Sequence, residues 1–500
     1  MQPSTELARD AIGLREVLFQ SITHMAPAAA VAFSIIVGSP FGAGALPLAV
    51  VLALIACLLV AVSIGQLAKH LPSAGGFYTY VSRGLHPSLG FLVAFGYALA
   101  EALVAPLLYL IFGNVIASTL NTEFGWSYDA WWMIAAVAAA LLVFALGYLG
   151  IRISTETGTV LGVFEIVVFA ALALWLIVKA GGNNTLSVFG TSHANVEGFR
   201  GFSGVAAASI FTILAFIGFE AAAPMAEEAR DPRRTIKQAV FWSALGIGVF
   251  YVLTTYAATV YFGPDRMASF LEFGDGNPWD GLARAVWGGG WVLVFLAVAN
   301  SAIANSNAGA NATTRTWYAM ARIRLLPTAL ARTNPTRHSP YVAVTVQFVL
   351  ALIVALWLGN QFTPIEAFAL VATIVTTVVV LIYILVNLAC VVFYLRERRS
   401  EFNPLLHAVV PILGILAFIP AWFTALGIGE GLFSWVSPLP YPLNRAGLVV
   451  GIWFAIGVVF LIWLYARHPE RVRETGRIFL DEEPGTAPSG DLPTTREELA

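Results

Sequence analysis

The feature that most constrains this chain is an interrupted apolar segment at 216–239, FIGFEAAAPMAEEARDPRRTIKQA. It contains Gly218, Glu220 and Pro224 and then becomes strongly charged. In hydrocarbon, every backbone group that Gly or Pro frees needs another partner, and a charged side chain costs about 2.5–3.5 kcal/mol on insertion scales. Irregular polar backbone survives at membrane depth where it lines a binding cavity. The segment therefore indicates a membrane protein that binds and moves something.

Composition supports a membrane protein. Hydrophobic residues make up 58% of the chain and charged residues 11%, against about 45–50% and 25% in soluble domains. The net charge of −2 and the lack of a basic stripe give no reason to expect a nucleic-acid partner. Cys57 and Cys390 both lie in apolar segments, so neither a disulfide framework nor a cysteine metal site is expected.

Twelve segments are apolar for about the 20 residues that a membrane-spanning helix needs. They cover 17–38, 46–68, 89–118, 131–149, 155–178, 204–226, 239–262, 289–321, 341–358, 364–395, 406–428 and 443–466. The segment 277–290 is too polar to span and is expected to form a short surface helix. We expect 1–16 to be a cytoplasmic N-terminus without a signal peptide, and 467–500 to be a disordered cytoplasmic tail.

The distribution of positive charge predicts the orientation. With the N-terminus inside, the inner segments hold 22 of the 27 Lys and Arg. The outer loops hold only Lys179, Arg200, Arg266, Arg284 and Arg445. Both termini are therefore predicted to be cytoplasmic, in a multi-pass protein of the cytoplasmic membrane.

The first apolar segment predicts a helix break at Pro27. Proline lacks an N–H and clashes with the carbonyl group four residues back, so the helix must kink or open there. Opening would free N–H groups around Ala26 to Ala30, at the N-terminal end of the following half-helix, where a carboxylate is favoured. A simple kink with satisfied polar caps is the alternative.

The sixth segment breaks at the corresponding place if 17–178 and 204–395 are two five-helix repeats, with 406–466 as two extra helices. Paired interruptions in two repeats indicate a midplane binding site. Carbonyl groups freed near Ala215 to Gly218 could accept an ammonium group, and Phe216 and Phe219 could close over it. Glu220 is either a gate carboxylate or a structural ion-pair partner.

Other polar residues lie inside apolar segments. The eighth segment carries Asn305 and Ser306 among several Asn, Ser and Thr residues, which could line an aqueous path, ligate a cation or bond neighbouring helices. Glu101 and Glu165 are isolated carboxyl groups in apolar surroundings. Each could exchange protons, pair with a cationic substrate or make a polar contact between helices. His24 is interpreted as a capped or interfacial histidine rather than a proton relay.

The chain resembles the amino acid–polyamine–organocation permeases, bacterial members in particular, over roughly residues 12–466. The matching motifs are LPSAGGFYTYVSRGLHPSLGF at 71–91, FIGFEAAAPMAEEARDPRRTI at 216–236 and TRTWYAMARIRLLP at 314–327. The resemblance implies an all-α fold of twelve helices, with the five-plus-five inverted repeat of the leucine transporter type and two further helices. It also implies alternating access around a site between helices 1, 3, 6, 8 and 10.

Carried over residue by residue, the resemblance implies a set of substrate-binding positions on helices 1, 3 and 6. These are Met25, Ala26, Pro27, Ala28, Ala29, Ala30, Gly96, Tyr97, Glu101, Ala215, Phe216, Ile217, Gly218, Phe219 and Glu220. Ion coupling is expected to involve Glu165, Asn305 and Ser306. The chain departs from the family pattern in two places: Met25-Ala26-Pro27-Ala28 replaces a glycine-rich break, and Glu165 stands where some proton-coupled members have lysine.

We therefore predict a secondary transporter that imports an amino acid or related amine, with H⁺ or Na⁺ as the coupling ion and no cofactor. A putrescine-type permease is the near alternative, because such permeases have an acid at a place similar to Glu101, shortly before a proline equivalent to Pro106. An amine sensor that signals without transport is a further alternative. An enzyme is not predicted, since the chain has no HExxH, no GxSxG and no paired Asp motif in a membrane segment.

Overall fold

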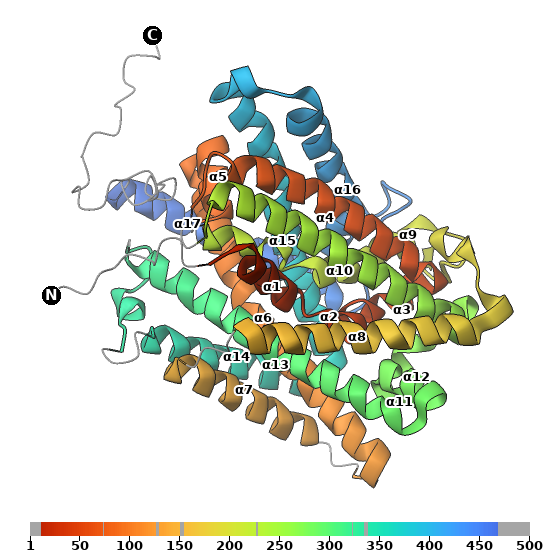
Figure 1. The fold of residues 1–500 in the computed structure, drawn as a ribbon. Helices are drawn as coiled ribbons and strands as arrows, with labels where there is room; N and C mark the ends of the chain where they lie inside the picture. Colours follow the sequence, from red (N-terminus) through yellow and green to blue (C-terminus); the bar gives the residue numbers. More distant parts are fainter. Residues whose placement is uncertain are drawn as a thin grey trace.

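A computed structural model describes residues 12–73, 75–126, 130–150, 155–226, 229–322, 324–334 and 339–468 of the chain. Long helices pack side by side in one bundle (Figure 1). The short α1 and α2 lie near its centre, with α4 and α10 on one side and α8 and α13 on the other (Figure 1). Residues 1–11, 469–500 and the acidic pair Glu227 and Glu228 lie outside the described residues, so only the first two residues of the predicted tail 467–500 are described.

The long helices follow the predicted segments closely. They are α4 Leu46–Ala68, α6 Pro87–Phe124, α7 Trp131–Leu149, α8 Thr155–Ala180, α9 Phe202–Phe216, α10 Pro232–Phe262, α13 Trp291–Arg322, α14 Tyr341–Gln361, α15 Pro364–Arg396, α16 Val410–Leu426 and α17 Ala446–Arg467. The first crossing is built from short pieces: α1 Leu14–Met25, α2 Pro27–Ala29, the π-helix η1 Ala30–Ser34, the 3₁₀ turn η2 Ile36–Gly38 and α3 Ser39–Gly42. The π-helix η11 Leu405–Val409 leads into α16.

Within the described residues, eleven helical ranges are long and apolar enough to cross a membrane. The first range, Leu14–Ala68, has 55 residues and turns at the 3₁₀ element η3 Ala43–Ala45, where Ala43 has φ 44°. Because that range holds two crossings, the bundle has the twelve crossings that the sequence predicts. The predicted twelve-helix fold of the leucine transporter type is confirmed, whereas the domain boundaries remain a prediction.

Hydropathy misplaces the start of the seventh crossing. The prediction begins at 239, but α10 begins at Pro232. Hydropathy stops at the charged residues Arg233, Arg234 and Lys237, although their backbone is helical. Proline suits the first helical position, since its missing N–H needs no intrahelical partner there. The additional turns therefore extend the helix beyond its apolar part.

Several short elements were not predicted. They are α5 Phe77–Gly84, the antiparallel pair β1 Asn195–Val196 and β2 Phe199–Arg200, α11 Phe273–Gly276, and the 3₁₀ turns η4 Gly181–Asn183, η5 Leu186–Phe189, η7 Pro264–Glu272, η8 Gly288–Gly290, η9 Thr328–Ala331, η10 Arg399–Glu401 and η12 Leu443–Arg445. The expected surface helix is present as α12 Pro278–Trp287. One side of it is buried against the bundle, where the Trp279 indole N–H donates to the carbonyl oxygen of Val31 at 3.0 Å.

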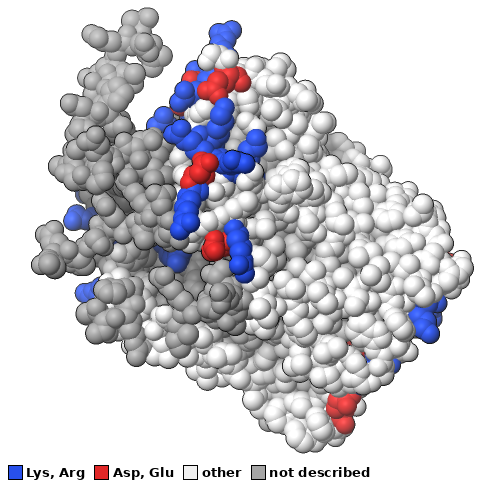
Figure 2. Space-filling model, in the orientation of Figure 1, with Lys and Arg blue, Asp and Glu red and all other residues white. Residues whose placement is uncertain are grey.

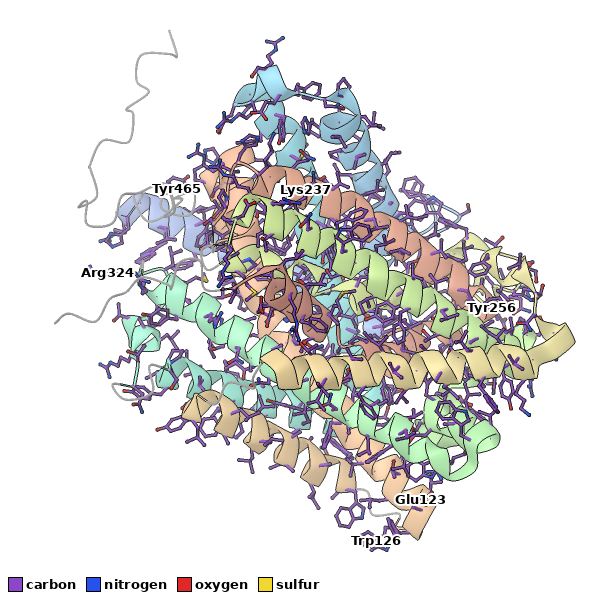
Figure 3. All side chains as sticks on the ribbon, viewed as in Figure 1. Glu123, Trp126, Lys237, Tyr256, Arg324 and Tyr465 are labelled. Atoms are coloured by element: carbon purple, nitrogen blue, oxygen red, sulfur yellow. The ribbon has the colours of Figure 1, made fainter. Side chains whose placement is uncertain are left out.

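Charged side chains gather at the ends of the bundle. Figure 2 shows most Lys and Arg of this face along one end, with a broad uncharged surface between the ends. Lys237, Arg324 and Tyr465 lie towards that end, whereas Glu123, Trp126 and Tyr256 lie towards the other (Figure 3).

Segments that were predicted to lie on the same side of the membrane are in contact. On the predicted inner side, Lys69 pairs with Glu401 at 2.6 Å, and Arg83 with Glu397 at 3.2 Å. On the predicted outer side, Arg284 pairs with Glu123. The loops are therefore sorted as the even number of crossings requires. Which end faces the cytoplasm remains a prediction.

Candidate functional site

The first crossing is broken at a single residue. Helix α1 ends at Met25, Ala26 adopts the left-handed conformation with φ 47° and ψ 69°, and α2 begins at Pro27. Because Pro27 has no N–H, the helical ladder is interrupted here. The Ala26 N–H donates to the Thr23 carbonyl oxygen at 3.2 Å, and the Ala30 N–H returns to the Ala26 carbonyl oxygen at 2.8 Å. The predicted break is therefore present, with helical geometry on both sides of it.

The N-terminal end of the second half-helix faces a carboxyl group of the chain itself. The Ala28 N–H lies 3.5 Å from Glu165 Oε2. The other oxygen of Glu165 accepts from Asn300 Nδ2 at 2.5 Å. Helix N-termini favour negative charge because their N–H groups lack intrahelical partners. Glu165 thus lies where the sequence places the carboxylate of a substrate.

The sixth crossing is broken over two residues. Helix α9 ends at Phe216, Ile217 is extended with ψ 125°, and Gly218 has φ 120°. The 3₁₀ turn η6, Phe219–Met225, follows. A Cβ on Gly218 would lie 2.7 Å from the carbonyl carbon of His24, so glycine is required by both its φ and this close approach. The Gly218 N–H donates to Glu220 Oε2 at 2.9 Å.

One hydroxyl group joins the two breaks. Tyr251 of α10 lies with its hydroxyl oxygen 2.8 Å from the carbonyl oxygen of Met25 and 3.0 Å from that of Ala215. These are carbonyl groups at the C-terminal ends of α1 and α9, which lack intrahelical partners. Ser21 adds a second link, donating to the Phe219 carbonyl oxygen at 2.9 Å. The two half-helices are therefore tied together at their broken ends.

A cavity of about 40 Å³ lies between the two breaks. Its walls come from helices 1, 3, 6, 8 and 10, the helices between which the resemblance places the site. They are His24, Met25, Ala26, Ala29, Ala30, Ser34, Val104, Leu107, Leu108, Leu214, Ala215, Ile217, Asn305 and Val375. Most of these side chains are aliphatic. Ligand pockets usually measure about 300–1,000 Å³, so this volume is too small for a bound substrate without some opening of the helices.

Only some of the predicted site residues line this cavity. Those that do are Met25, Ala26, Ala29, Ala30, Ala215, Ile217 and Asn305. Pro27, Ala28, Gly218 and Glu220 belong to the breaks but do not line it. Their roles in binding remain predictions.

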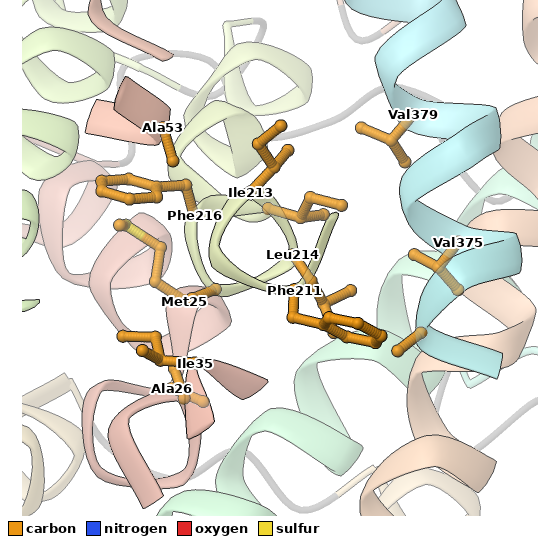
Figure 4. Packing of buried hydrophobic residues seen from close by; sticks show 14 of the residues in the cluster. Met25, Ala26, Ile35, Ala53, Phe211, Ile213, Leu214, Phe216, Val375 and Val379 are labelled. Carbon is orange, nitrogen blue, oxygen red and sulfur yellow. The ribbon is translucent and has the colours of Figure 1, made fainter. Parts of the chain in front are cut away.

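The two aromatic residues of the second break do not cover the cavity in this structure. Phe216 is fully buried and packs edge-on against Tyr251, with ring centroids 5.3 Å apart. Figure 4 shows it beside Ala53 of α4 and close to Met25. Phe219 packs against Tyr383 of α15, at 5.7 Å between centroids. Neither ring lies over the cavity, so the expectation that both close over it requires a change of conformation.

The positions predicted on helix 3 do not line the cavity. A Cβ on Gly96 would meet the Phe454 ring of α17 at 2.8 Å, so Gly96 allows close packing of α6 against α17. The Tyr97 ring packs edge-on against Phe77 of α5. The helix-3 residues that do reach the cavity are Val104, Leu107 and Leu108. They lie along the helix from Glu101, at the spacing of one helical face.

Glu101 is not isolated, because it faces His24. His24 Nε2 lies 3.6 Å from Glu101 Oε2, and both side chains are 3% exposed. The interpretation of His24 as a capped or interfacial residue is therefore wrong. It is buried, it lines the cavity, and it pairs with an acid on helix 3.

The polar residues of helix 8 have mixed roles. The Ser306 and Thr313 hydroxyl groups donate to carbonyl oxygens within α13, at 2.6 and 2.8 Å, which is an ordinary intrahelical use of these side chains. Asn300 instead bonds to Glu165, and Asn305 lines the cavity. Any part that Ser306 plays in ion coupling remains a prediction.

Sequence reasoning missed Tyr251 and the aliphatic walls. A single tyrosine in an apolar helix carries no positional signal, because its partners are 36 and 226 residues away. The aliphatic residues Val104, Leu107, Leu214 and Val375 look like any others that face lipid or core. Only the way in which the helices pack in the folded bundle brings these residues to the cavity.

Comparisons with known proteins agree with the fold. The amino acid permease family matches residues 12–454. The chain is 26% identical over 432 residues to the low-affinity putrescine importer PlaP of Escherichia coli K12, covering 84% of this chain and 85% of that protein. It is 23% identical over 451 residues to the branched-chain amino acid permease BcaP of Bacillus subtilis, covering 86% and 87%.

A solved structure shares the architecture. The manganese transporter of Eremococcus coleocola aligns with a TM-score of 0.53 at 14% identity, over 92% of this chain and 94% of that one. Within the described part of the present chain, no group of three or more His, Cys, Asp or Glu residues could hold a metal ion. At 14% identity, the likeness concerns the fold alone. With its family match across nearly the whole sequence, the chain belongs to the amino acid permease family, within the amino acid–polyamine–organocation superfamily of secondary transporters.

Proposed function

We propose that the protein imports a neutral amino acid with an aliphatic side chain across the cytoplasmic membrane, by alternating access and together with H⁺. The observation that carries this proposal is the cavity between the two broken helices. Its ends are the half-helix termini, which offer carbonyl oxygens and N–H groups, and its remaining walls are mostly aliphatic.

The polar ends of the cavity suit the backbone of an amino acid. Carbonyl oxygens at the C-terminal ends of α1 and α9 favour an ammonium group, and the N-terminal end of α2 favours a carboxylate. In this structure Tyr251 and Glu165 lie at these groups. Substrate binding would therefore replace contacts that the chain now makes with itself.

The cavity walls favour an apolar side chain. Val104, Leu107 and Leu108 of α6 line the cavity together with Leu214 of α9 and Val375 of α15. An aliphatic side chain gains about 25 cal/mol for each Å² of apolar surface that it buries there. Burying a charged group without a partner against the same walls would cost free energy.

Putrescine is the second candidate, because the chain is similar to the putrescine importer PlaP. A diamine needs a carboxylate at the cavity for its second charge. Glu101 does not line the cavity and lies behind His24. This placement favours the amino acid.

The remaining features are proposed from the sequence and the fold together. Coupling to H⁺ is favoured by the buried acids Glu101, Glu165 and Glu220, since carboxyl groups can carry protons through a membrane protein. No organic cofactor is needed. Both termini are placed in the cytoplasm because the predicted inner segments hold most of the Lys and Arg.

Uptake into proteoliposomes tests this function. Purified protein would be reconstituted, and labelled L-leucine and putrescine compared under an inward H⁺ gradient, each with and without Na⁺. We expect L-leucine to accumulate against its gradient, to depend on the H⁺ gradient and to be indifferent to Na⁺. Uptake of putrescine alone would overturn the substrate class, and a requirement for Na⁺ would overturn the coupling ion. Binding without accumulation would favour the sensor alternative.

A further inference from the structure

Three buried titratable side chains meet beside the cavity. His24 of α1 faces Glu101 of α6 at 3.6 Å. Glu220 of η6 accepts from the N–H of Gly218 at 2.9 Å, and the His24 ring lies against Gly218. All three are at most 4% exposed. We call them the His24 cluster. Because helices 1, 3 and 6 each supply one member, the cluster joins three of the elements that surround the cavity.

The oxygen atoms of these acids are incompletely bonded. Glu101 Oε2, Glu220 Oε1 and His24 Nδ1 are buried and have no hydrogen-bond partner among the described residues. Glu220 has a donor at its other oxygen only, the Gly218 N–H, whereas Glu165 has one at both oxygens, Ala28 N–H and Asn300. Donors stabilise an ionised carboxylate, whereas a buried oxygen without a donor is better accommodated in a protonated carboxyl group. The unpaired atoms therefore indicate that protons reside on the His24 cluster rather than on Glu165.

Among the described residues, no fixed positive charge acts on the cluster. No Lys or Arg within the described chain acts on any of the three side chains. The other titratable groups that face the cluster are neutral ones: Tyr97 on α6, Tyr383 on α15 and Cys57 on α4. Tyr251 of α10 directs its hydroxyl group to Met25 and Ala215 instead. The charge of the cluster is therefore set by its own protons.

We propose that the His24 cluster binds the transported proton, a site that rests on the proposed H⁺-coupled function. Shared among two carboxyl groups and one imidazole, two protons leave the cluster neutral and one proton leaves it with a charge of −1. Enclosing a net charge in a low-dielectric interior is costly. Uptake of the second proton therefore favours the closed arrangement seen here, and opening to water allows its release.

The position of His24 connects this proton to the substrate. His24 lines the cavity, and its ring lies against Gly218, where a Cβ would come within 2.7 Å of the ring carbon Cδ2. A change in the protonation of the cluster thus acts at the cavity wall and at the second break. Substrate binding and proton binding therefore both act on the contacts of His24 with the cavity and with Gly218.

An infrared pH titration of the purified protein tests the site without any substrate. Protonated buried carboxyl groups give a C=O band that titrates. We expect Glu101→Gln and Glu220→Gln each to remove part of this band, and the matched variant Glu165→Gln to leave it unchanged. Loss of the band in Glu165→Gln alone would overturn the proposal. Because no ligand is present, this outcome is independent of whether the protein imports L-leucine.

Transport gives the second readout. In proteoliposomes, we expect Glu101→Gln to keep exchange of labelled for unlabelled L-leucine, which also shows that it is folded. Accumulation driven by the H⁺ gradient should fall about tenfold, as expected for a coupling free energy of ordinary size. If exchange is lost as well, the same comparison is made with Glu220→Gln. Gradient-driven accumulation at the level of the unmodified protein in both variants would overturn the proposal, whereas its absence in the unmodified protein would overturn the proposed function.

Discussion

The two helix breaks look alike in the bundle but are satisfied in different ways. At the second break, the freed Gly218 N–H finds its acceptor two residues later, in Glu220. At the first break, the Ala28 N–H finds Glu165, which is 137 residues away on α8. The second break is thus a largely local structure, whereas the first depends on the packing of another helix. Tyr251 is shared, because its hydroxyl group reaches a carbonyl oxygen at each break.

This difference has a consequence for movement. A break whose partner lies in its own turn can move as a unit, since its hydrogen bond travels with it. A break whose partner lies on another helix must exchange that partner when the helices shift. We therefore expect the first break to respond to what binds at Glu165, and the second to act as a rigid corner. Substitutions at each break can test this comparison.

The largest effect is expected for Gly218→Leu. The new side chain would start 2.7 Å from the His24 backbone and ring, and φ 120° is strained for any residue with a Cβ. We expect uptake of L-leucine to be lost although the protein still reaches the membrane. Proteoliposome uptake with quantified protein measures this. Gly246→Leu is the matched control, because nothing lies within 4 Å of a Cβ on Gly246. Normal uptake by Gly218→Leu would contradict the proposal that the second break acts as a rigid corner.

Tyr251→Phe should affect both breaks at once. It removes the hydroxyl group shared by Met25 and Ala215 and keeps the aromatic packing with Phe216. Leaving a buried carbonyl group without its donor costs about 1–3 kcal/mol, so a clear fall in the melting temperature of the purified protein is expected. Tyr256→Phe, on the same helix, removes only an exposed bond to Asn184 and should change little. Equal melting temperatures for the two variants would mean that the link between the breaks contributes nothing.

Glu165→Gln separates the breaks. It removes the negative charge at the N-terminal end of α2 while keeping the shape of the side chain and an oxygen for Asn300 or Ala28. If a substrate carboxylate competes with Glu165 there, KM for L-leucine should fall about threefold, the size of a helix-terminus interaction. The concentration dependence of uptake measures this, and the pH dependence of accumulation should persist. Loss of that pH dependence would restore the sequence-based hypothesis that Glu165 couples the ion.

The same contrast explains how much the sequence could predict. The second break was readable because Gly218, Glu220 and Pro224 lie within one apolar segment. The first was found from Pro27, but the partner of its N–H could not be assigned, since nothing local relates Ala28 to Glu165. The boundaries of α4 and α7 were correct because hydropathy and helix end at the same residues.

The site was predicted less completely than the fold. The cavity lies between helices 1, 3, 6, 8 and 10, where the resemblance places the site, but none of the three positions predicted on helix 3 lines it. Gly96 and Tyr97 pack against α17 and α5, and the cavity begins at Val104. The pairing of His24 with Glu101 was also missed, because each looked isolated in its own segment. Helix rotation and long-range pairs depend on tertiary packing, which a single sequence does not reveal.

The smallest expected effect tests the first break alone. Ala26 has φ 47°, and an L-residue in the left-handed region is strained by about 1–2 kcal/mol. Ala26→Gly relieves this strain but adds freedom to the unfolded chain, worth about 0.4–1 kcal/mol. A small rise in melting temperature is therefore expected. Ala29→Gly is the control, since Ala29 has a helical φ of −67° and glycine there should lower stability by about 1 kcal/mol. If the melting temperature rises for Ala26→Gly and falls for Ala29→Gly, only three positions away, the break is one residue long. If both variants are destabilised, Ala26 does not keep this left-handed conformation, and the first break extends beyond one residue.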